Sequence, residues 1–227
     1  MGRNKKKRRG GRSIFFIVLI IGILIGLLLM KFNGFYWVKN KIHKVQGDRL
    51  ITIDAGHGGN QPGSLAGDVV EKELNLQIAL KLQVELQNRG YQVIMTRTGD
   101  ETVDLLERTE IANNTGADLF LSIHQNAFED GSVHGIETWY HDGKAATGSE
   151  KLATLIQSSL VRALEAADRG IRSGDKLVVV RETIMPACLV EAGYITNENE
   201  RSLLKSDEYQ NKIATAIADG IDSYFQQ

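Results

Sequence analysis

Four side chains that could bind a metal ion or transfer a proton lie beside apolar segments of the chain. His57 follows the first of these segments in DAGHGG, and His124 ends another in LFLSIHQNA. Glu191 lies near the end of a third in LVEAGY, and Glu71 begins a segment with helical periodicity. In an open parallel sheet, ligands bind just beyond the carboxyl ends of the strands. We therefore expect two histidines and two carboxylates to converge on one rim of a sheet.

The segment that begins at Glu71 reads EKELNLQIALKLQ and is typical of an amphipathic helix. At about 100° per residue, Leu74, Ile78 and Leu82 fall on one stripe. Glu71 falls in the middle of that apolar stripe, whereas Glu73 points to the opposite side. Because burying a charge is costly unless the charge is paired or bound to a metal, the pattern predicts that Glu71 binds a cation.

Two imidazoles and one carboxylate with an open fourth position are typical of a hydrolytic zinc site. Zinc polarises a carbonyl group and lowers the pKa of bound water to about 7. A further carboxylate that does not bind the metal can take a proton from water and pass it to a leaving amine. The alternative interpretation of Glu191 is an ion pair with an arginine such as Arg97 or Arg108.

Each of the other three side chains also has a purely structural interpretation. His57 could cap the glycine-rich turn, and His124 could be a hydrogen-bonded histidine of the core. Glu71 could extend to solvent from the first helical turn, where a negative charge interacts favourably with the helix dipole. The coincidence of all four candidates at one expected rim favours a metal site over four unrelated structural explanations.

Other polar residues are weaker candidates for contacts with substrate or with the metal ligands. Asp54 could orient the glycine-rich turn that follows it through hydrogen bonds, a supporting task that many metal sites need. Asn126 could contact substrate or support the histidine two residues before it. Arg169 and Arg172 in DRGIRSGD could contact anionic groups of a substrate, although an exposed loop is the simpler interpretation.

Alternating apolar and amphipathic segments define the elements that must position these residues. Strands are expected at 49–54, 91–97, 118–124, 135–141, 176–182 and 187–193. Helices are expected at 70–88, 104–115, 148–168 and 207–225. Strands that alternate with helices predict a three-layer α/β fold, with a mostly parallel twisted sheet between helices. The strand segments are almost continuously apolar, which is typical of strands covered on both faces.

The N-terminal segment differs from the rest of the chain in both charge and hydropathy. Residues 1–12 hold seven lysines and arginines and no acidic residue, and residues 14–30 hold no charged side chain. Seventeen residues rise about 25 Å as a helix, near the short limit for a bilayer span. A cleaved signal peptide is the alternative, but the apolar run exceeds the usual signal core and no A-x-A-like site follows it.

We therefore expect four regions along the chain. Residues 1–13 form a basic cytoplasmic tail, and residues 14–30 form a transmembrane anchor. Residues 31–48 form a juxtamembrane stalk, and residues 49–227 form one catalytic domain. This arrangement predicts a single-pass protein of a bacterial cell membrane, with the catalytic domain on the extracytoplasmic side.

The remaining composition limits the class of partner. The whole chain has 27 basic and 28 acidic residues, so the part that follows the basic tail is clearly acidic. An acidic domain argues against nucleic acid as a partner. Cys188 is the single cysteine and lies in the apolar sequence MPACLVEAGY, so we expect it to be buried and not to form an intramolecular disulfide.

The order of several motifs resembles one known family. The matching segments are ITIDAGHGG, EKELNLQIA, VIMTR, LFLSIHQNA, DRGI, MPACLVEAGYITN and KIATAIADGI. They resemble the zinc-dependent N-acetylmuramoyl-L-alanine amidases of the amidase-3 group, over about residues 50–225. Individually the motifs are modest, but together in this order they are specific. The resemblance implies a phosphorylase/hydrolase-like fold and peptidoglycan as the substrate.

The resemblance also implies the task of each site residue. It implies Zn²⁺ held by His57, Glu71 and His124, and Glu191 as the catalytic glutamate. The bond cleaved would be the amide between the lactyl group of N-acetylmuramic acid and L-alanine of the stem peptide. Gln125 replaces a small residue that is common in the family, so substrate contacts near the adjacent histidine could differ.

Two other functional classes remain open from the sequence. One is a different zinc hydrolase of the cell wall, such as a peptidase or a sugar deacetylase. The other is a membrane-anchored binding protein that keeps the fold without catalysis. The complete set of four site residues argues against the second class. No obvious wall-binding module is present, so we expect the membrane tether to supply localisation by raising the effective concentration near the wall.

Overall fold

The computed structural model describes residues 46–143 and 147–226 and has a six-stranded mixed sheet at its centre. The strand order is β4-β1-β5-β8-β6-β7. The strands of this sheet are β1 (Leu50–Ala55), β4 (Gln92–Met95), β5 (Leu119–Asn126), β6 (Ile136–Tyr140), β7 (Asp168–Ser173) and β8 (Ala187–Tyr194). The pairs β4–β1, β1–β5 and β5–β8 are parallel, whereas β6 runs antiparallel to β8 and parallel to β7. The predicted mostly parallel sheet is thus confirmed, with its last two strands reversed.

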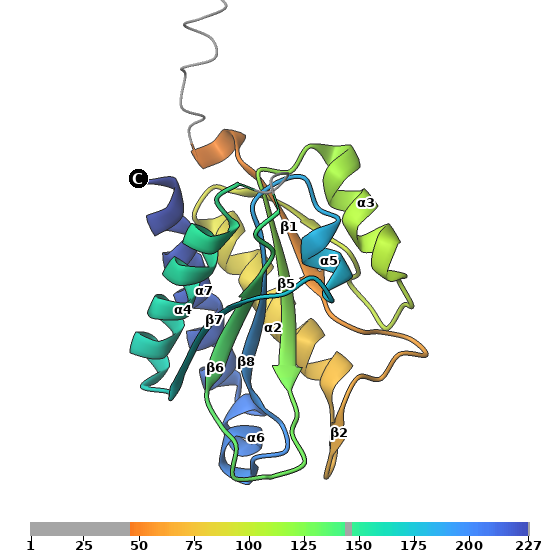
Figure 1. The fold of residues 1–227 in the computed structure, drawn as a ribbon, viewed down its shortest axis with the longest axis vertical. Helices are drawn as coiled ribbons and strands as arrows, with labels where there is room; N and C mark the ends of the chain where they lie inside the picture. Colours follow the sequence, from red (N-terminus) through yellow and green to blue (C-terminus); the bar gives the residue numbers. More distant parts are fainter. Residues whose placement is uncertain (1–45, 144–146, 227) are drawn as a thin grey trace, which may run out of the picture. The chain divides into compact units, whose positions relative to one another are not determined.

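Helices cover both faces of this sheet (Figure 1). The α-helices are α2 (Glu71–Asn88), α3 (Leu105–Thr115), α4 (Ser149–Leu164), α5 (Val178–Arg181), α6 (Glu198–Leu204) and α7 (Asp207–Phe225), and a short 3-10 helix η1 (Gln46–Asp48) precedes β1. One face carries α2, α4 and α7, and α7 packs against both of the other two. In the described part of the chain, the other face carries α3 and the short α5.

The face beneath the three long helices holds the main core of the protein. Ile51 and Ile53 of β1 point to this face, together with Leu121 of β5 and Val190 of β8. They pack against apolar side chains of the helices, among which Ile78, Leu82, Ile156, Leu160, Ile213 and Ile217 are all fully buried. Successive residues of a strand point to opposite faces. The alternate residues of the same strands are therefore directed at the thinner helical layer.

That second face has a smaller apolar cluster and several polar side chains. Phe120 of β5 and Leu189 of β8 pack there against Val179 and Val180 of α5. Trp139 of β6 lies at the margin of this cluster and is half-buried. Because α3 and α5 are short and lie over one part of the sheet (Figure 1), polar residues further along the same strand faces remain accessible.

The strand predicted at 176–182 is wrong, because residues 178–181 form the helix α5. The amides of Val180 and Arg181 donate to the carbonyl oxygen of Leu177, which closes a helical turn. Three consecutive valines favour a strand locally, but β8 already has β5 and β6 as neighbours on its two sides. The valines instead bury their side chains as a helical turn against the sheet, as tertiary packing overrides propensity.

The helix predicted at 148–168 is too long, and an additional strand follows it. Helix α4 ends at Leu164, where Glu165 adopts a left-handed conformation with φ of 50°. The segment Asp168–Ser173, expected to be an exposed loop, pairs with β6 as the edge strand β7. Four further elements lay outside the prediction, namely the 3-10 helix η1, the helix α6 and the short hairpin strands β2 (Leu65–Ala66) and β3 (Val69–Val70).

The predicted basic tail, the transmembrane anchor at 14–30 and most of the predicted stalk lie outside the described residues. Within residues 46–143 and 147–226, none of the helices combines the length and the apolar character that a membrane span requires. Cys188 is fully buried, and burial raises the pKa of its thiol, as the apolar sequence around it predicts.

Candidate metal centre

The glycine-rich turn after β1 is held in place by two arginines that are almost completely buried. Arg97 donates from Nε to the carbonyl oxygen of Ala55 (2.8 Å) and from Nη2 to that of Gly56 (3.0 Å). Arg108 donates from Nη2 to the carbonyl oxygen of His57 (2.8 Å). His57 has a left-handed backbone with φ of 61°, a conformation that is uncommon for a residue with a side chain. The arginines thus hold the backbone in the shape that directs the imidazole toward α2.

Asp54 supports this turn indirectly. Its Oδ1 accepts hydrogen bonds from Arg108 Nη1 (2.7 Å) and from Thr96 Oγ1 (2.7 Å), and its Oδ2 accepts one from Ser122 Oγ (2.6 Å). Both partners of the Asp54–Arg108 ion pair are buried, so their charges are paired where isolated charges would be costly. Asp54 therefore reaches the turn through Arg108, which contacts the carbonyl oxygen of His57.

Glu71 is the first residue of α2, and its side chain is only 4 % exposed. The loop folds back over the start of the helix, since the amide of Glu71 donates to the carbonyl oxygen of Ser64 (3.0 Å). The amide of Ser64 donates in return to Glu71 Oε2 (2.9 Å), and Asn75 Nδ2 donates to Oε1 (3.2 Å). The predicted helical stripe is confirmed, because Glu71 is buried with Leu74 while Glu73 is exposed.

The structure brings His57, Glu71 and His124 together. Glu71 Oε1 lies 3.3 Å from His57 Nε2 and 2.9 Å from His124 Nδ1. One ligand atom from each residue lies within 4.8 Å of the other two. Atoms that share one tetrahedral zinc ion at about 2.0–2.1 Å lie about 3.4 Å apart. The three side chains therefore have the types and the spacing of the three protein ligands of a catalytic zinc site.

The carboxylate of this group is held in its charged form. Burial by itself raises the pKa of Glu71, but hydrogen bonds from His124 and His57 outweigh burial and leave the pKa well below its usual range. A carboxylate that stays ionised and faces two imidazole nitrogens is the donor set that a divalent cation such as zinc requires. The arrangement fits zinc on the chemistry and on the distances of its donors.

His124 occupies the end of β5, and Gly56 provides the space for its ring. A Cβ atom at position 56 would overlap the imidazole of His124. The His57 and His124 rings lie edge to face, with ring centroids 4.8 Å apart. The Gln125 side chain is buried, so it does not alter the accessible surface next to His124. The backbone amide of Gln125 donates a hydrogen bond to Glu71 Oε1 (3.3 Å).

Glu191 lies directly beside His124, because the two residues are paired in register on β8 and β5. Its Oε2 is buried and has no hydrogen-bond partner among the described residues. Burial raises the pKa of Glu191 well above its usual value, and the nearby carboxylates of Glu71 and Glu137 raise it further. Neither Arg97 nor Arg108 forms an ion pair with it, since both arginines are engaged at the turn after β1. A carboxyl group in such surroundings is suited to exchange a proton with a bound molecule.

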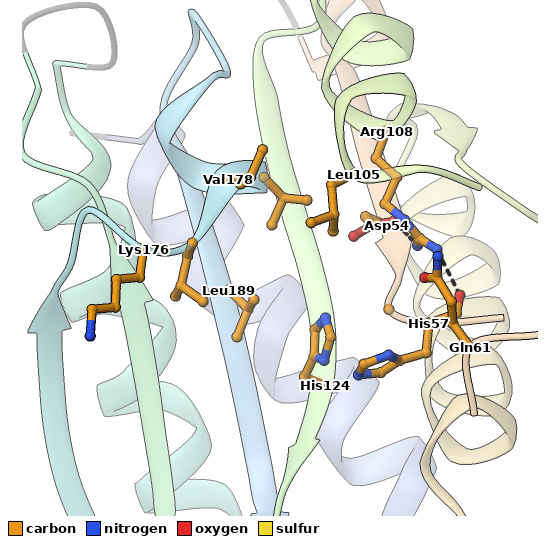
Figure 2. Close-up of a pocket in the computed structure, with 12 residues that line it drawn as sticks. Asp54, His57, Gln61, Leu105, Arg108, His124, Lys176, Val178 and Leu189 are labelled. Atoms are coloured by element: carbon orange, nitrogen blue, oxygen red, sulfur yellow. Dashed lines mark hydrogen bonds and ion pairs between the residues drawn. The ribbon is translucent and has the colours of Figure 1, made fainter. Parts of the chain in front are cut away.

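A cavity of about 420 Å³ lies beside the histidines on the α3 and α5 side of the sheet. Figure 2 shows the imidazoles of His57 and His124 close together at one end of this cavity. The apolar side chains of Leu105, Val178 and Leu189 line it further from the histidines. The metal ligands thus border a hollow large enough for a substrate group.

The weaker candidates fall into two places. Asp54 lies behind the turn that carries His57, as described above. Among the described residues, the Asn126 side chain has no hydrogen bond to His124, and its Nδ2 donates to Glu137 Oε1 (2.8 Å). Arg169, on the edge strand β7, also approaches Glu137, with Nε at 3.6 Å from Oε2. Asn126 and Arg169 therefore meet at a carboxylate that the sequence did not single out.

Sequence reasoning missed several residues that shape the site. Asn75 lies one helical turn after Glu71 and is fully buried, and a polar residue on the apolar stripe was the available signal. Glu137 is buried as the second residue of β6, and a lone carboxylate in a segment predicted to be a strand was the available signal. Arg108 carried no comparable signal, because its carbonyl partners are set by the backbone path of a distant loop.

Comparisons with known proteins identify a hydrolase family, in agreement with the geometry of the site. Residues 51–223 match the amidase-3 family, described as N-acetylmuramoyl-L-alanine amidase. The chain is 38 % identical over 189 residues to the N-acetylmuramoyl-L-alanine amidase LytC of Bacillus subtilis, covering 83 % of this chain and 38 % of LytC. It is 31 % identical over 233 residues to the germination-specific N-acetylmuramoyl-L-alanine amidase of the same organism, covering 95 % of this chain and 97 % of that protein.

A solved structure supports the match in three dimensions. The N-acetylmuramoyl-L-alanine amidase of Clostridium difficile 630 superposes with a TM-score of 0.75 at 40 % identity, covering 79 % of this chain and 97 % of that one. The matched part contains the turn of His57, the start of α2 and the ends of β5 and β8. The chain therefore belongs to the N-acetylmuramoyl-L-alanine amidase family, and it is a hydrolase that cleaves the amide bond between N-acetylmuramic acid and L-alanine in peptidoglycan.

Proposed function

We propose that this amidase uses zinc, with His57, Glu71 and His124 as the ligands and Glu191 as the catalytic proton carrier. The single observation that supports this most strongly is the position of Glu71 Oε1, which lies within 3.3 Å of a ring nitrogen of each histidine. A buried carboxylate shared by two imidazoles is expected where a cation completes the group. When bound, zinc supplies a Lewis acid that polarises the scissile carbonyl and lowers the pKa of water.

Other residues of the chain transfer the proton and hold the ligands in position. Glu191 lies one strand away from His124 on the same face of the sheet, so its carboxyl group lies beside the proposed metal ligands. It accepts the proton of the attacking water and then donates that proton to the departing nitrogen of L-alanine. Bond cleavage thus needs no covalent enzyme intermediate. The turn held by Arg97 and Arg108 keeps His57 in position throughout.

Digestion of purified peptidoglycan tests this function and separates it from its alternatives. An amidase releases intact stem peptides with a new amino terminus at L-alanine. A peptidase would expose other amino termini, and a sugar deacetylase would expose none on the peptide. We expect only L-alanine termini, and we expect them to disappear with a zinc chelator and to return when zinc is added. Amidase activity that survives complete removal of metal would contradict the zinc proposal.

The same proposal includes the location of the enzyme. Residues 14–30 anchor the chain in the membrane and the basic tail stays in the cytoplasm, which leaves the catalytic domain next to the wall. The support is the uninterrupted apolar run and the seven positive charges before it. Tethering raises the effective concentration of the domain at the wall. Cleavage of the stalk, within residues 31–49, should therefore reduce lysis of intact walls but not turnover of soluble muropeptides. Unchanged lysis of intact walls would refute the tether.

A further inference from the structure

A second group of polar residues lies beyond Glu191 on the same face of the sheet. Glu137 of β6 pairs directly with Glu191 of β8, which in turn pairs with His124 of β5. Paired residues on neighbouring strands point to the same side of a sheet. The next strand is the edge strand β7, which carries Arg169 and Arg172. A row of functional side chains therefore runs from the metal ligands to the edge of the sheet.

The carboxylate of Glu137 is fully occupied by donors from the protein. Oε1 accepts hydrogen bonds from Asn126 Nδ2 (2.8 Å) and Trp139 Nε1 (3.1 Å). Oε2 accepts one from Arg172 Nε (3.0 Å) and lies 3.6 Å from Arg169 Nε. With only 6 % of its side chain exposed, Glu137 has no free site for a ligand. Its structural effect is to hold two arginines by their inner nitrogens.

The outer ends of the two guanidinium groups face outward. The side chains of Arg169 and Arg172 are 33 % and 45 % exposed. Within the described ranges, neither Nη atom of Arg172 has a hydrogen-bond acceptor, and Arg169 makes one long contact from Nη1 to the carbonyl oxygen of His134 (3.4 Å). The guanidinium groups of Arg169 and Arg172 share the carboxylate of Glu137, and Arg169 also lies near the carboxylate of Glu200.

Aromatic rings contact the guanidinium groups of both Arg169 and Arg172. The guanidinium of Arg169 lies 5.2 Å from the ring centroid of Tyr194, and that of Arg172 lies 5.8 Å from the Trp139 ring. Tyr194 is itself buried, so it offers a fixed surface. An arginine held by its Nε and by an aromatic ring loses little conformational freedom when its outer nitrogens bind a carboxylate in bidentate fashion.

We infer that Arg169 and Arg172 form a subsite that binds a carboxylate of the stem peptide, an inference that rests on the proposed function. Glu137 lies two strands from His124, or about 10 Å at ordinary strand spacing. An extended peptide advances about 3.4 Å per residue. The subsite is therefore at the distance of the second or third residue beyond the scissile amide.

The cavity beside the histidines has a different character. Leu105, Val178 and Leu189 give it a mainly apolar lining, which also includes Lys176 and the paired charges of Asp54 and Arg108. N-acetylated sugars are neutral, whereas the stem peptide carries free carboxylates. The two arginines of β7 therefore suit the peptide, and the apolar lining suits an uncharged part of the substrate.

Two soluble probes test this subsite with the full chain loaded with zinc. One is an N-acetylmuramoyl tripeptide with free peptide carboxylates, and the other is the same compound with every carboxylate converted to a carboxamide. We expect the wild-type kcat/KM to be about 10- to 100-fold higher for the carboxylate probe, as charge-assisted bidentate hydrogen bonds imply. Equal values for the two probes would overturn the inference.

Substitutions test whether Arg169 and Arg172 cause the preference for the carboxylate probe. Arg169→Gln with Arg172→Gln should bring the ratio of the two kcat/KM values close to one, mainly through the carboxylate probe. Arg169→Lys with Arg172→Lys keeps the charges but loses the planar fork, so we expect an intermediate ratio. Arg162→Gln, on the exposed surface of α4 across the sheet, removes a matched charge and should leave the ratio unchanged. An unchanged ratio in the glutamine double variant would contradict the assignment.

The design separates failure of the subsite from failure of the proposed function. The ratio is measured within one preparation, so partial misfolding lowers both rates without changing it. If the wild type cleaves neither probe, the proposed function fails. Calorimetric binding of the two probes then still tests the arginines, because equal affinities would overturn the subsite.

Discussion

The two faces of the central sheet are covered to very different extents. Beneath α2, α4 and α7 (Figure 1), the strands contribute to an apolar core whose side chains are almost entirely buried. Beneath α3 and α5 the cover is short, and the ends of β5, β8 and β6 present His124, Glu191 and Glu137 in register. The same strands therefore serve stability on one face and chemistry on the other, because alternate residues of each strand point in opposite directions.

One residue from the closed face of the sheet, which α2, α4 and α7 cover, contributes to the site on the open face beneath α3 and α5. Glu71 belongs to α2, a helix whose stripe is otherwise part of the main core. Its position at the first helical residue lets its carboxylate reach past the rim of the sheet to His57 and His124. Substitutions on the two faces should accordingly separate loss of catalysis from loss of stability.

The largest effect is expected on the open face at Glu191. Glu191→Gln removes the group that carries the proton but keeps its shape, so we predict a fall in kcat of about 10²- to 10⁴-fold. Zinc content should remain unchanged, because Glu191 is not one of the proposed ligands. Steady-state kinetics with elemental analysis measures both, and the exposed Glu198→Gln serves as control. Near-normal turnover would reassign Glu191 to a structural task.

The second effect concerns the space that holds His124. Gly56→Ala introduces a methyl group that overlaps the imidazole of His124, so the ligand must move. We predict that zinc affinity and kcat/KM both fall, by about tenfold or more, as for other disturbances next to metal ligands. Gly47→Ala is the matched control, since a Cβ there meets only the Gly90 carbonyl oxygen at 3.8 Å. Full zinc occupancy in Gly56→Ala at low zinc concentration would argue against the proposed ligand.

On the closed face the expected loss is of stability alone. Ile217 of α7 is fully buried in the main core. Ile217→Ala should lower the free energy of unfolding by about 2–5 kcal/mol, through lost burial and the cavity that remains. Leu203→Ala, at an exposed position of α6, should change it by less than about 0.5 kcal/mol. Denaturant unfolding measures both, and kcat/KM per folded molecule should stay at the wild-type value in each.

The smallest effect is a shift in pH dependence. A protonated Glu191 cannot accept a proton, so activity falls as the pH falls through its pKa. Burial raises that pKa, and the like charge of Glu137 raises it further. Glu137→Gln removes this charge, so the acidic limb of the pH profile of kcat/KM should move to lower pH. Bound zinc affects the pKa of Glu191 equally in the wild type and in Glu137→Gln. The test is therefore the difference in pH between the acidic limbs of the two proteins. The control Glu73→Gln should leave the acidic limb at its wild-type pH. An acidic limb that moves to higher pH in Glu137→Gln would contradict the prediction.

The sequence predicted much of this arrangement, because the main signals are local. Apolar periodicity identified α2, α3 and α7 almost to the residue, and it identified the strand before His57 and the strands that contain His124 and Glu191. The helical stripe also predicted a buried Glu71. These features depend on neighbours within a few residues, which is the range over which pattern and propensity act.

The errors arise where distant contacts decide the structure. The valines of α5 favour a strand by propensity but have no free strand beside them, and Asp168–Ser173 becomes a strand only because β6 offers an edge. The row from Glu191 to Glu137 and Arg172 depends on the register of three strands far apart in the sequence. No local pattern contains that register, so the arginines resembled an ordinary exposed loop.

The most direct test of the metal centre is the zinc content of the purified full chain and of its His124→Ala variant, measured by elemental analysis after dialysis against metal-free buffer. We predict about one zinc ion per wild-type chain and almost none in the variant, because His124 is one of three protein ligands. A wild-type chain without zinc, or a variant that retains it fully, would contradict the assignment of His57, Glu71 and His124 as the metal centre.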